Sequence, residues 1–244
     1  MDAFILSPNQ YDRILEGTSV TLQVLGASLV LGLVLSLVFG IARLSDHRWI
    51  RGGALVFVEF ARGISSVVLL FVMAIAIPIL LGWEQRSLLV LGSIALGINM
   101  GGYGAEIIRG AILSVPKGQS EASIALNLTN TQRLRHVVLP QAMRVILPPM
   151  GNLTIEILKG TALVFLVGLA DLLYEIEKLD TNQALAEDPV STPILYINAL
   201  VIYFVLAQII NGIFRFAESR IERRFTSRNG GVPVANAVPA GAGG

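Results

Sequence analysis

Long apolar segments alternate with short polar ones along most of this chain. The apolar segments cover residues 18–42, 54–81, 87–108, 144–170 and about 193–217. A helix of about 25 residues is roughly 37 Å long, enough to cross a hydrocarbon core about 30 Å thick with some tilt. The pattern predicts an all-α integral membrane protein with about five transmembrane helices, the fourth of them broken near its start by Pro148 and Pro149.

Composition supports a membrane protein and excludes several other classes. Of the 244 residues, 54% are hydrophobic and only 14% are charged, which is too apolar for an ordinary soluble domain. The formal net charge is +1, so no bulk electrostatic attraction to nucleic acid is expected. Without cysteine, and with only His47 and His136 as histidines, the chain offers no constellation of metal ligands.

The distribution of basic residues predicts the orientation in the membrane. Of 18 Lys and Arg residues, 13 lie in segment 43–51, in segment 109–144 and in the tail from 215, all on one side of the predicted spans. By the positive-inside rule, the N-terminus is outside and the C-terminus is cytoplasmic. Residues 1–17 lack the basic start and cleavage site of a signal peptide and are expected to form a short non-cytoplasmic lead-in to a transmembrane domain over 18–226. Residues 227–244, rich in Gly, Ala and Pro, are expected to be a disordered cytoplasmic tail.

A polar stretch at 115–151 separates the third and fourth predicted spans. Gln119 and Ser120 follow a Pro and Gly break and could cap a short helix, in which Glu121 would lie in the first turn and favour the helix dipole. Asn127 is expected near the end of this helix, because Asn tolerates the left-handed conformation. These features alone equally fit an ordinary amphipathic loop at the membrane surface.

The order of residues within this stretch forms a spaced signature. Its members are Glu121, Ala122, Ser123, Asn127, Val137, Leu139 and Pro140. The signature resembles the cytoplasmic coupling loop of ABC importer permeases: Glu-Ala-Ala, three residues, Gly, nine residues, Ile, one residue, Leu-Pro. This chain keeps the spacing and departs from the pattern at Ser123, Asn127 and Val137. The resemblance implies that the short helix docks in a groove of a separate ATPase subunit, where small residues allow close approach and Glu121 anchors the helix.

Three acid–base pairs lie within or at the ends of the apolar segments. They are Glu59/Arg62, Glu106/Arg109 and Glu156/Lys159, all spaced i, i+3 so that each pair shares one helix face. A lone charge in hydrocarbon costs at least about 2.5–3.5 kcal/mol, so such groups normally face a bundle interior or a cavity. We therefore hypothesise that the pairs line the inner half of a translocation path and exchange partners as it opens. The alternative is static ion pairs near the membrane surface, which is least compatible with the deep position of Glu156 and Lys159.

Two longer segments indicate which branch of these permeases the chain resembles. Residues 99–119, NMGGYGAEIIRGAILSVPKGQ, and the run PPMGNLTIEILKGTAL from 148 resemble the polar amino-acid uptake branch of these permeases, with its Asn-x3-Tyr-x2-Glu-x2-Arg-Gly and Pro-Pro-x-Gly-Asn patterns. The likeness covers about 18–225. Within the branch, residues 103–106, the phrase IALNL and Glu156 are most similar to ectoine and hydroxyectoine permeases, whereas Ile64, Ser65 and Ser66 depart from the branch. The candidates for lining the pathway are Asn99, Tyr103, Asn152, Glu156 and Thr161.

The residues and the resemblance together predict a permease subunit of a type I ABC importer in the bacterial inner membrane. Its solutes would be polar amino acids or related zwitterionic compatible solutes. The implied partners are an ATPase subunit that holds ATP and Mg, an extracytoplasmic solute-binding protein, a second permease copy or paralogue, and membrane lipid. No P-loop is present, so this chain is expected to bind no cofactor and to catalyse no reaction itself. A stand-alone ion-coupled secondary carrier and a purely structural membrane subunit are the alternatives.

Overall fold

The computed structural model describes residues 6–83, 87–182 and 190–228, with side chains up to 223. Parts of the predicted lead-in, of the turn after the second predicted span, of the acidic stretch before the fifth and of the predicted tail lie outside these ranges. Within them, all regular structure is helical. The helices are α1 (Pro8–Ala42), α2 (Arg48–Gly63), α3 (Ser66–Phe71), the π-helical η2 (Val72–Ala76), α4 (Ile77–Leu80), α5 (Leu88–Leu113), α6 (Lys117–Ala125), α7 (Asn130–Arg133), the π-helical η3 (Leu134–Val138), α8 (Leu139–Thr161), the 3-10 helix η4 (Ala162–Val167), α9 (Leu172–Thr181) and α10 (Thr192–Arg228).

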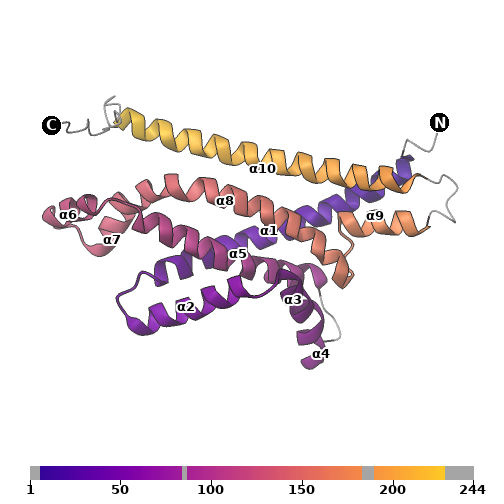
Figure 1. Ribbon diagram of the computed structural model, residues 1–244, viewed down its shortest axis with the longest axis horizontal. Coiled ribbons are helices and arrows are strands. Elements are labelled where there is room, and N and C mark those ends of the chain that lie inside the picture. Colours follow the sequence, from indigo (N-terminus) through magenta and orange to yellow (C-terminus); the bar gives the residue numbers. More distant parts are fainter. Residues whose placement is uncertain (1–5, 84–86, 183–189, 229–244) are drawn as a thin grey trace, which may run out of the picture.

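The predicted membrane fold is confirmed. Four helical segments of the described chain are long and apolar enough to cross a bilayer: Pro8–Ala42, Leu88–Leu113, Asn130–Val167 and Thr192–Arg223. The pair Arg48–Gly63 and Ser66–Leu80 would make a fifth span if it crosses as one unit. The long helices lie side by side, and α6, α7 and the C-terminal end of α10 gather at one end of the bundle (Figure 1). The N-terminus and α9 lie at the opposite end (Figure 1), as the predicted orientation requires.

Small residues bring α1 and α5 into close contact. Ser28, Gly32, Ser36 and Gly40 recur at helical spacing along α1, and all four are buried. A Cβ added at Gly32 would lie 2.6 Å from the Met100 sulfur, so only glycine fits there without movement. The Ser28 hydroxyl donates a hydrogen bond to the Ser93 carbonyl at 3.2 Å. The glycines of α5 serve close packing, and the helix runs through them unbroken.

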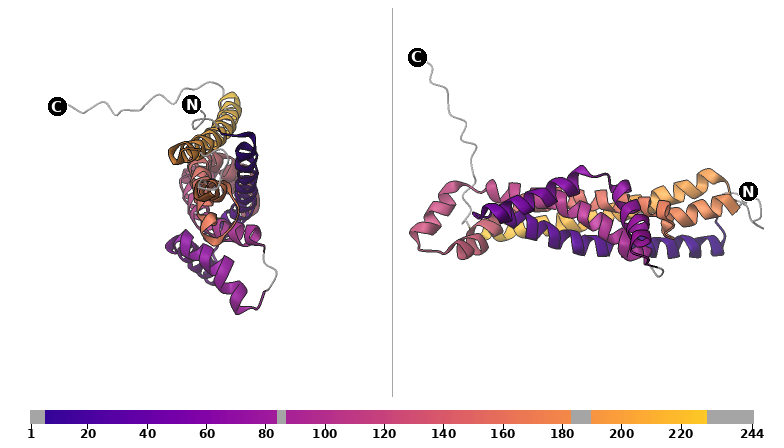
Figure 2. Two further views of the ribbon diagram at one scale, coloured as in Figure 1. Left: turned by 90° about the vertical axis from the view of Figure 1, so that its right-hand side faces the viewer. Right: turned by 90° about the horizontal axis from the view of Figure 1, so that it is seen from below.

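The hydrophobic core lies between α1, α5 and α8, with α10 packed along α8 (Figures 1 and 2). Its largest fully buried side chains include Met100 and Ile108 of α5 and Leu158 of α8. A second, smaller cluster surrounds Leu172 and Ile176 of α9 and joins that helix to the first turns of α1 and α10. This second cluster holds α9 at the end of the bundle opposite α6.

Three features differ from the sequence prediction. The second predicted span is not one straight helix, because Ile64 and Ser65 are extended and the two parts meet at 102°. The predicted break at Pro148 and Pro149 is wrong, because α8 runs through both prolines. The prolines leave the carbonyls of residues 144 and 145 without their helical donors, and both of these residues are exposed.

The third difference is α9, which lies between the fourth and fifth predicted spans, where the apolar pattern predicted no helix. Asp171 caps this helix, and its side chain accepts a hydrogen bond from the Tyr174 amide. Leu172 and Ile176, four residues apart, bury one face. The sequence therefore contained both a capping residue and an apolar i, i+4 pair that could have predicted the helix.

Candidate functional site

The short helix of the signature forms as predicted, at the exposed end of the bundle. α6 and α7 extend beyond the ends of α5 and α8 (Figures 1 and 2). Glu121 and Ala122 are exposed in the middle of α6. The helix begins earlier than expected, after Pro116, so the prediction that Gln119 or Ser120 caps it is wrong. Pro116 has an extended backbone and occupies the N-cap position, so the helix starts at the next residue, Lys117.

The loop that follows α6 has a defined backbone. Asn127 has a φ angle of 55°, which confirms the left-handed conformation expected at this position. Ser123 is buried, and its hydroxyl donates to the Ser120 carbonyl at 2.7 Å. Thr129 and Gln132 cap α7 reciprocally, with the Thr129 amide donating to Gln132 Oε1 at 2.9 Å and the Gln132 amide donating to Thr129 Oγ1 at 3.3 Å. The loop therefore presents α6 from a fixed backbone.

Two apolar side chains on this surface have little contact with the rest of the chain. Ile124 is 56% exposed and Leu126 is 75% exposed, on and just after α6. Beside Glu121 and Ala122, they form an exposed surface of mixed apolar and acidic character. Such a surface at the end of a membrane protein is suited to binding another protein.

The second half of the signature is continuous with a membrane-spanning helix. Val137 lies in η3, while Leu139 and Pro140 form the first turn of α8. Residues Asn130–Val167 form a single helical run of 38 residues. The Gln141 side chain donates to Gln119 Oε1 at 3.4 Å and so joins α8 to α6. The exposed loop is thus linked both covalently and by a hydrogen bond to the fourth predicted span.

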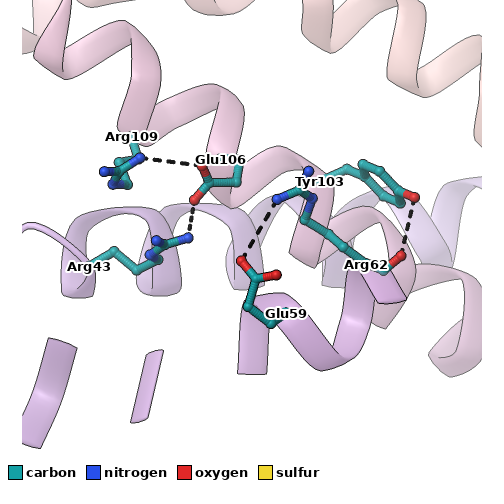
Figure 3. Close-up of polar contacts among 6 residues, drawn as sticks. All are labelled: Arg43, Glu59, Arg62, Tyr103, Glu106 and Arg109. Atoms are coloured by element: carbon teal, nitrogen blue, oxygen red, sulfur yellow. Dashed lines mark hydrogen bonds and ion pairs between the residues drawn. The ribbon is translucent and has the colours of Figure 1, made fainter. Parts of the chain in front are cut away.

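A cluster of charges ties α1 to α5 near the same end (Figure 3). Glu106 of α5 lies between two arginines: it forms an ion pair with Arg43 and another with Arg109 at 3.3 Å. The predicted pair Glu106/Arg109 is therefore present. The sequence placed Arg43 in a loop, whereas the structure places it at the C-cap of α1 with a side chain only 13% exposed.

A second group of polar contacts holds α2 against α5. The Tyr103 hydroxyl donates to the Arg62 carbonyl at 3.3 Å, and the Arg62 guanidinium lies 5.5 Å from the centre of the Tyr103 ring (Figure 3). Glu59 lies 3.9 Å from Arg62, which makes this predicted pair a loose one. Asn99 is buried, and its amide donates to the Ala61 carbonyl at 3.2 Å. These contacts fix the α2 segment just before its sharp bend.

One face of α8 carries exposed polar side chains within an apolar span. Asn152, Glu156 and Lys159 recur at helical spacing and are all exposed, while Leu153 and Leu158 are buried on the other side. In the described part of the chain, Glu156 and Lys159 share this face without forming an ion pair with each other. The Thr161 hydroxyl is buried and donates to the Leu158 carbonyl at 2.6 Å. Of the pathway candidates on α8, only Thr161 is therefore enclosed in the bundle.

The predicted site residues thus fall into three places. The signature lies in the exposed loop and the first turn of α8, the paired charges lie on α2 and α5, and the unpaired charges lie on the open face of α8. The structure shows one arrangement of these pairs, and their exchange of partners stays a prediction. A group of histidine or acidic residues able to hold a metal ion is absent from the ranges that the structure describes.

Comparison with known proteins places this arrangement in a family. Residues 16–223 match the family described as binding-protein-dependent transport system inner membrane component. A probable amino-acid ABC transporter permease of Sinorhizobium fredii is 38% identical over 85% of this chain and 87% of that protein. The glutamine transport system permease of Escherichia coli is 34% identical over 86% of this chain and 92% of that protein. A crystal structure of an amino acid ABC transporter with histidines matches with a TM-score of 0.76 at 28% identity, over 86% of this chain and 94% of that one.

Proposed function

Because this chain belongs to the family of binding-protein-dependent transport system inner membrane components, we propose that it is the permease subunit of an ATP-driven importer of amino acids. It lies in the inner membrane as a multi-pass protein. An extracytoplasmic binding protein delivers the solute, and a separate ATPase subunit binds ATP and Mg. This chain forms the path through the membrane and holds neither cofactor itself.

The exposed α6 surface is the observation that carries the proposal. Glu121, Ala122, Ile124 and Leu126 are exposed at the end of the bundle predicted to be cytoplasmic, where an ATPase can reach them. The helix that follows continues through the membrane as one run, so a movement of the loop reaches the transmembrane region. A stand-alone carrier driven by an ion gradient would have no need for such a surface.

The open face of α8 supports a path formed with a second permease copy or a paralogue. Asn152, Glu156 and Lys159 would be unfavourable against lipid, so this face is expected to meet water or another subunit. Opposite charges that are not paired with each other suit a zwitterionic solute, whose carboxylate and ammonium groups need one partner each. We propose Glu156 and Lys159 as the charged residues of the path, and Arg62, Tyr103 and the Glu106 cluster as the groups at its inner end.

The proposed class of solute is taken from the solutes for which the relatives are named. The Sinorhizobium fredii and Escherichia coli proteins are named as amino-acid and glutamine permeases, and an amino acid is therefore the first solute to test. The narrower proposal of ectoine or hydroxyectoine rests on the likeness of residues 103–106, IALNL and Glu156 alone. Uptake of labelled glutamine by the complete system, in competition with unlabelled amino acids and ectoine, separates these possibilities. Uptake of labelled ectoine by a system that does not take up labelled glutamine would favour the narrower proposal.

A charge reversal on α6 tests the central claim. The tagged chain is purified from native membranes in a mild detergent, and co-purifying proteins are identified by mass spectrometry. We expect a P-loop ATPase to accompany the wild-type chain and to be lost with Glu121→Lys. The matched control is Glu16→Lys, an exposed glutamate of α1 at the opposite end of the bundle, which should retain the ATPase. If no ATPase accompanies the wild-type chain in several detergents, the carrier alternative replaces the importer.

A further inference from the structure

Asp171 is a buried carboxylic acid at the end of the bundle opposite α6. It caps α9, and its Oδ1 accepts a hydrogen bond from the Tyr174 amide at 3.0 Å. The residue is 0% exposed. Across the described residues, its Oδ2 has no hydrogen-bond partner and no Lys or Arg forms an ion pair with it. An ionised carboxylate in such a position is costly, and the usual outcome is that the group binds a proton.

This carboxyl is linked to hydroxyl groups of three other helices. Tyr203 of α10 is the side chain that interacts with it, and the Tyr203 oxygen is also buried without a hydrogen-bond partner among the described residues. Thr21 of α1 and Thr161 of α8 interact with the Tyr203 hydroxyl in turn, and both are 0% exposed. The cluster therefore joins α1, α8, α9 and α10 through one carboxyl and three hydroxyl groups.

The contact between α1 and α9 at this point is close. Thr21 Oγ1 accepts a hydrogen bond from the Leu172 amide at 3.1 Å. Gly17, one turn earlier, permits this approach, because a Cβ there would lie 2.8 Å from the Asp171 carbonyl oxygen. The first residue of α9 is thus held against α1 directly after the buried carboxyl.

In the described chain, the charged groups on the neighbouring elements form no ion pair with Asp171. On α9, Glu175 is 3.8 Å from Lys178, with which it forms its own ion pair. On α1, Arg13 and Glu16 are exposed. Tyr203 is the titratable side chain that faces Asp171 from α10, and α8 contributes the uncharged Thr161. Within the described chain, Asp171 therefore has no countercharge to favour its ionised form.

We infer that Asp171 and Tyr203 form a proton-binding site, and that the bound proton holds α9 against α1 and α10. The proton removes the charge of a carboxylate that has no countercharge, and it lets the neutral carboxyl and the Tyr203 hydroxyl share a hydrogen bond between the two buried oxygens that otherwise lack a partner. When the proton leaves, a bare carboxylate remains in an apolar contact between four helices. The N-terminal turn of α9 then opens toward water. With the predicted orientation, the site responds to the pH on the non-cytoplasmic side.

The pKa of Asp171 is consistent with a site that titrates in an accessible range. Burial raises this pKa from 3.8 to about 6, against the hydrogen bonds from the cap amides and the nearby Tyr203 hydroxyl group, which lower it. The pKa of Asp171 is higher in the folded state than in the opened state. The contribution of Asp171 to the stability of the closed α9 contact is therefore complete at low pH and is lost as the pH rises through about 6. If the opened state has the ordinary value of 3.8, opening becomes about ten times more favourable between about pH 5 and pH 8.

Hydrogen exchange tests this inference without relying on transport. The full chain is purified with its co-purifying subunits, and exchange of the amides of residues 172–176 is measured at about pH 5 and pH 8, corrected for the intrinsic pH dependence of exchange. We expect protection of the wild-type segment to fall about tenfold at the higher pH. Asp171→Asn retains the oxygen that accepts from the Tyr174 amide but cannot ionise, and its protection should be the same at both values. Asp12→Asn, an exposed position of α1, is the matched control and should behave as the wild type.

A second variant keeps the inference falsifiable if Asp171→Asn does not fold. Tyr203→Phe removes the hydroxyl group that lowers the Asp171 pKa, so the loss of protection should move to higher pH. Equal pH dependence in the wild type, Asp171→Asn and Tyr203→Phe would overturn the inference. Wild-type protection that depends on sodium concentration, and not on pH, would also overturn it by showing a metal cation in place of the proton.

Discussion

Glu106 is the single residue whose loss should most weaken the contact between α1 and α5. One of its carboxylate oxygens forms an ion pair with Arg43 of α1, and the other forms an ion pair with Arg109 of α5 itself (Figure 3). Glu106→Gln preserves the shape and removes the charge. The Arg43 side chain, only 13% exposed, is then left without a carboxylate partner.

The expected size of the effect follows from the exposures. Breaking a fully buried ion pair by removing one partner costs about 3–5 kcal/mol. The Glu106 side chain is 26% exposed and that of Arg109 34% exposed, so solvent screening reduces this to about 2 kcal/mol. For a chain of this size, 1 kcal/mol corresponds to roughly 2–4 °C, so we expect the melting temperature to fall by about 4–8 °C.

Glu59→Gln is the matched control. Glu59 is also followed by an arginine three residues later, but the two groups are 3.9 Å apart and their side chains are 61% and 38% exposed. Such an exposed pair contributes at most about 0.5 kcal/mol, and the melting temperature should change by less than about 2 °C. Thermal unfolding of the purified complexes, followed by tryptophan fluorescence, measures both variants.

The outcome decides what Glu106 does. Equal shifts for the two variants would refute the reasoning from burial. If Glu106→Gln melted as the wild type but took up no solute, Glu106 would act in the path instead of bracing two helices. A double-mutant cycle with Arg43→Met isolates the α1–α5 part, and the two variants together should cost less than the sum of their separate effects.

Three further predictions concern other parts of the chain. Asn127→Gly should keep ATPase-coupled uptake, whereas Asn127→Val should reduce it. A β-branched residue at a φ of 55° is strained by about 1–2 kcal/mol. Solute uptake by the complete system measures both variants. Gly17→Ala should destabilise the fold by about 1–3 kcal/mol and so lower the melting temperature, because the new methyl group meets the α9 backbone. Gly26→Ala, where the added Cβ meets open space, is the control and should be neutral or stabilising. Lys159→Met should lower solute uptake about tenfold or more without loss of the co-purified ATPase, and normal uptake would remove Lys159 from the path.

The parts of the fold that depend on local pattern could be read from the sequence. Apolar segments of sufficient length predict spans because a bilayer requires about 20 apolar residues per helix. The coupling signature placed a short helix after the third predicted span, and Asn127 was expected to be left-handed from residue type alone. Each of these inferences needs only a few neighbouring residues.

The parts that depend on packing could not be read in the same way. Arg43 and Glu106 are 63 residues apart, and only the contact of α1 with α5 brings them together. The bend at Ile64 and Ser65 interrupts an otherwise apolar run, so hydropathy alone does not reveal it. Pro148 and Pro149 remain helical because the surrounding helices hold α8, which overrides the local preference of proline. The buried cluster around Asp171 combines four elements and has no signature in any one of them.

The unbroken helix from Asn130 to Val167 behaves mechanically as a stiff rod. Its 38 residues span about 57 Å, and a tilt of about 10° around its middle would displace each end by about 5 Å in opposite directions. Val137 lies near one end, Glu156 is closer to the middle, and Thr161 lies near the other end. A push on the cytoplasmic loop would therefore move the outer end of the helix the opposite way, with the smallest displacement near Pro148 and a displacement of about 2 Å at Glu156. In a lever of this kind, the solute can stay at the fulcrum while the two entrances exchange access around it.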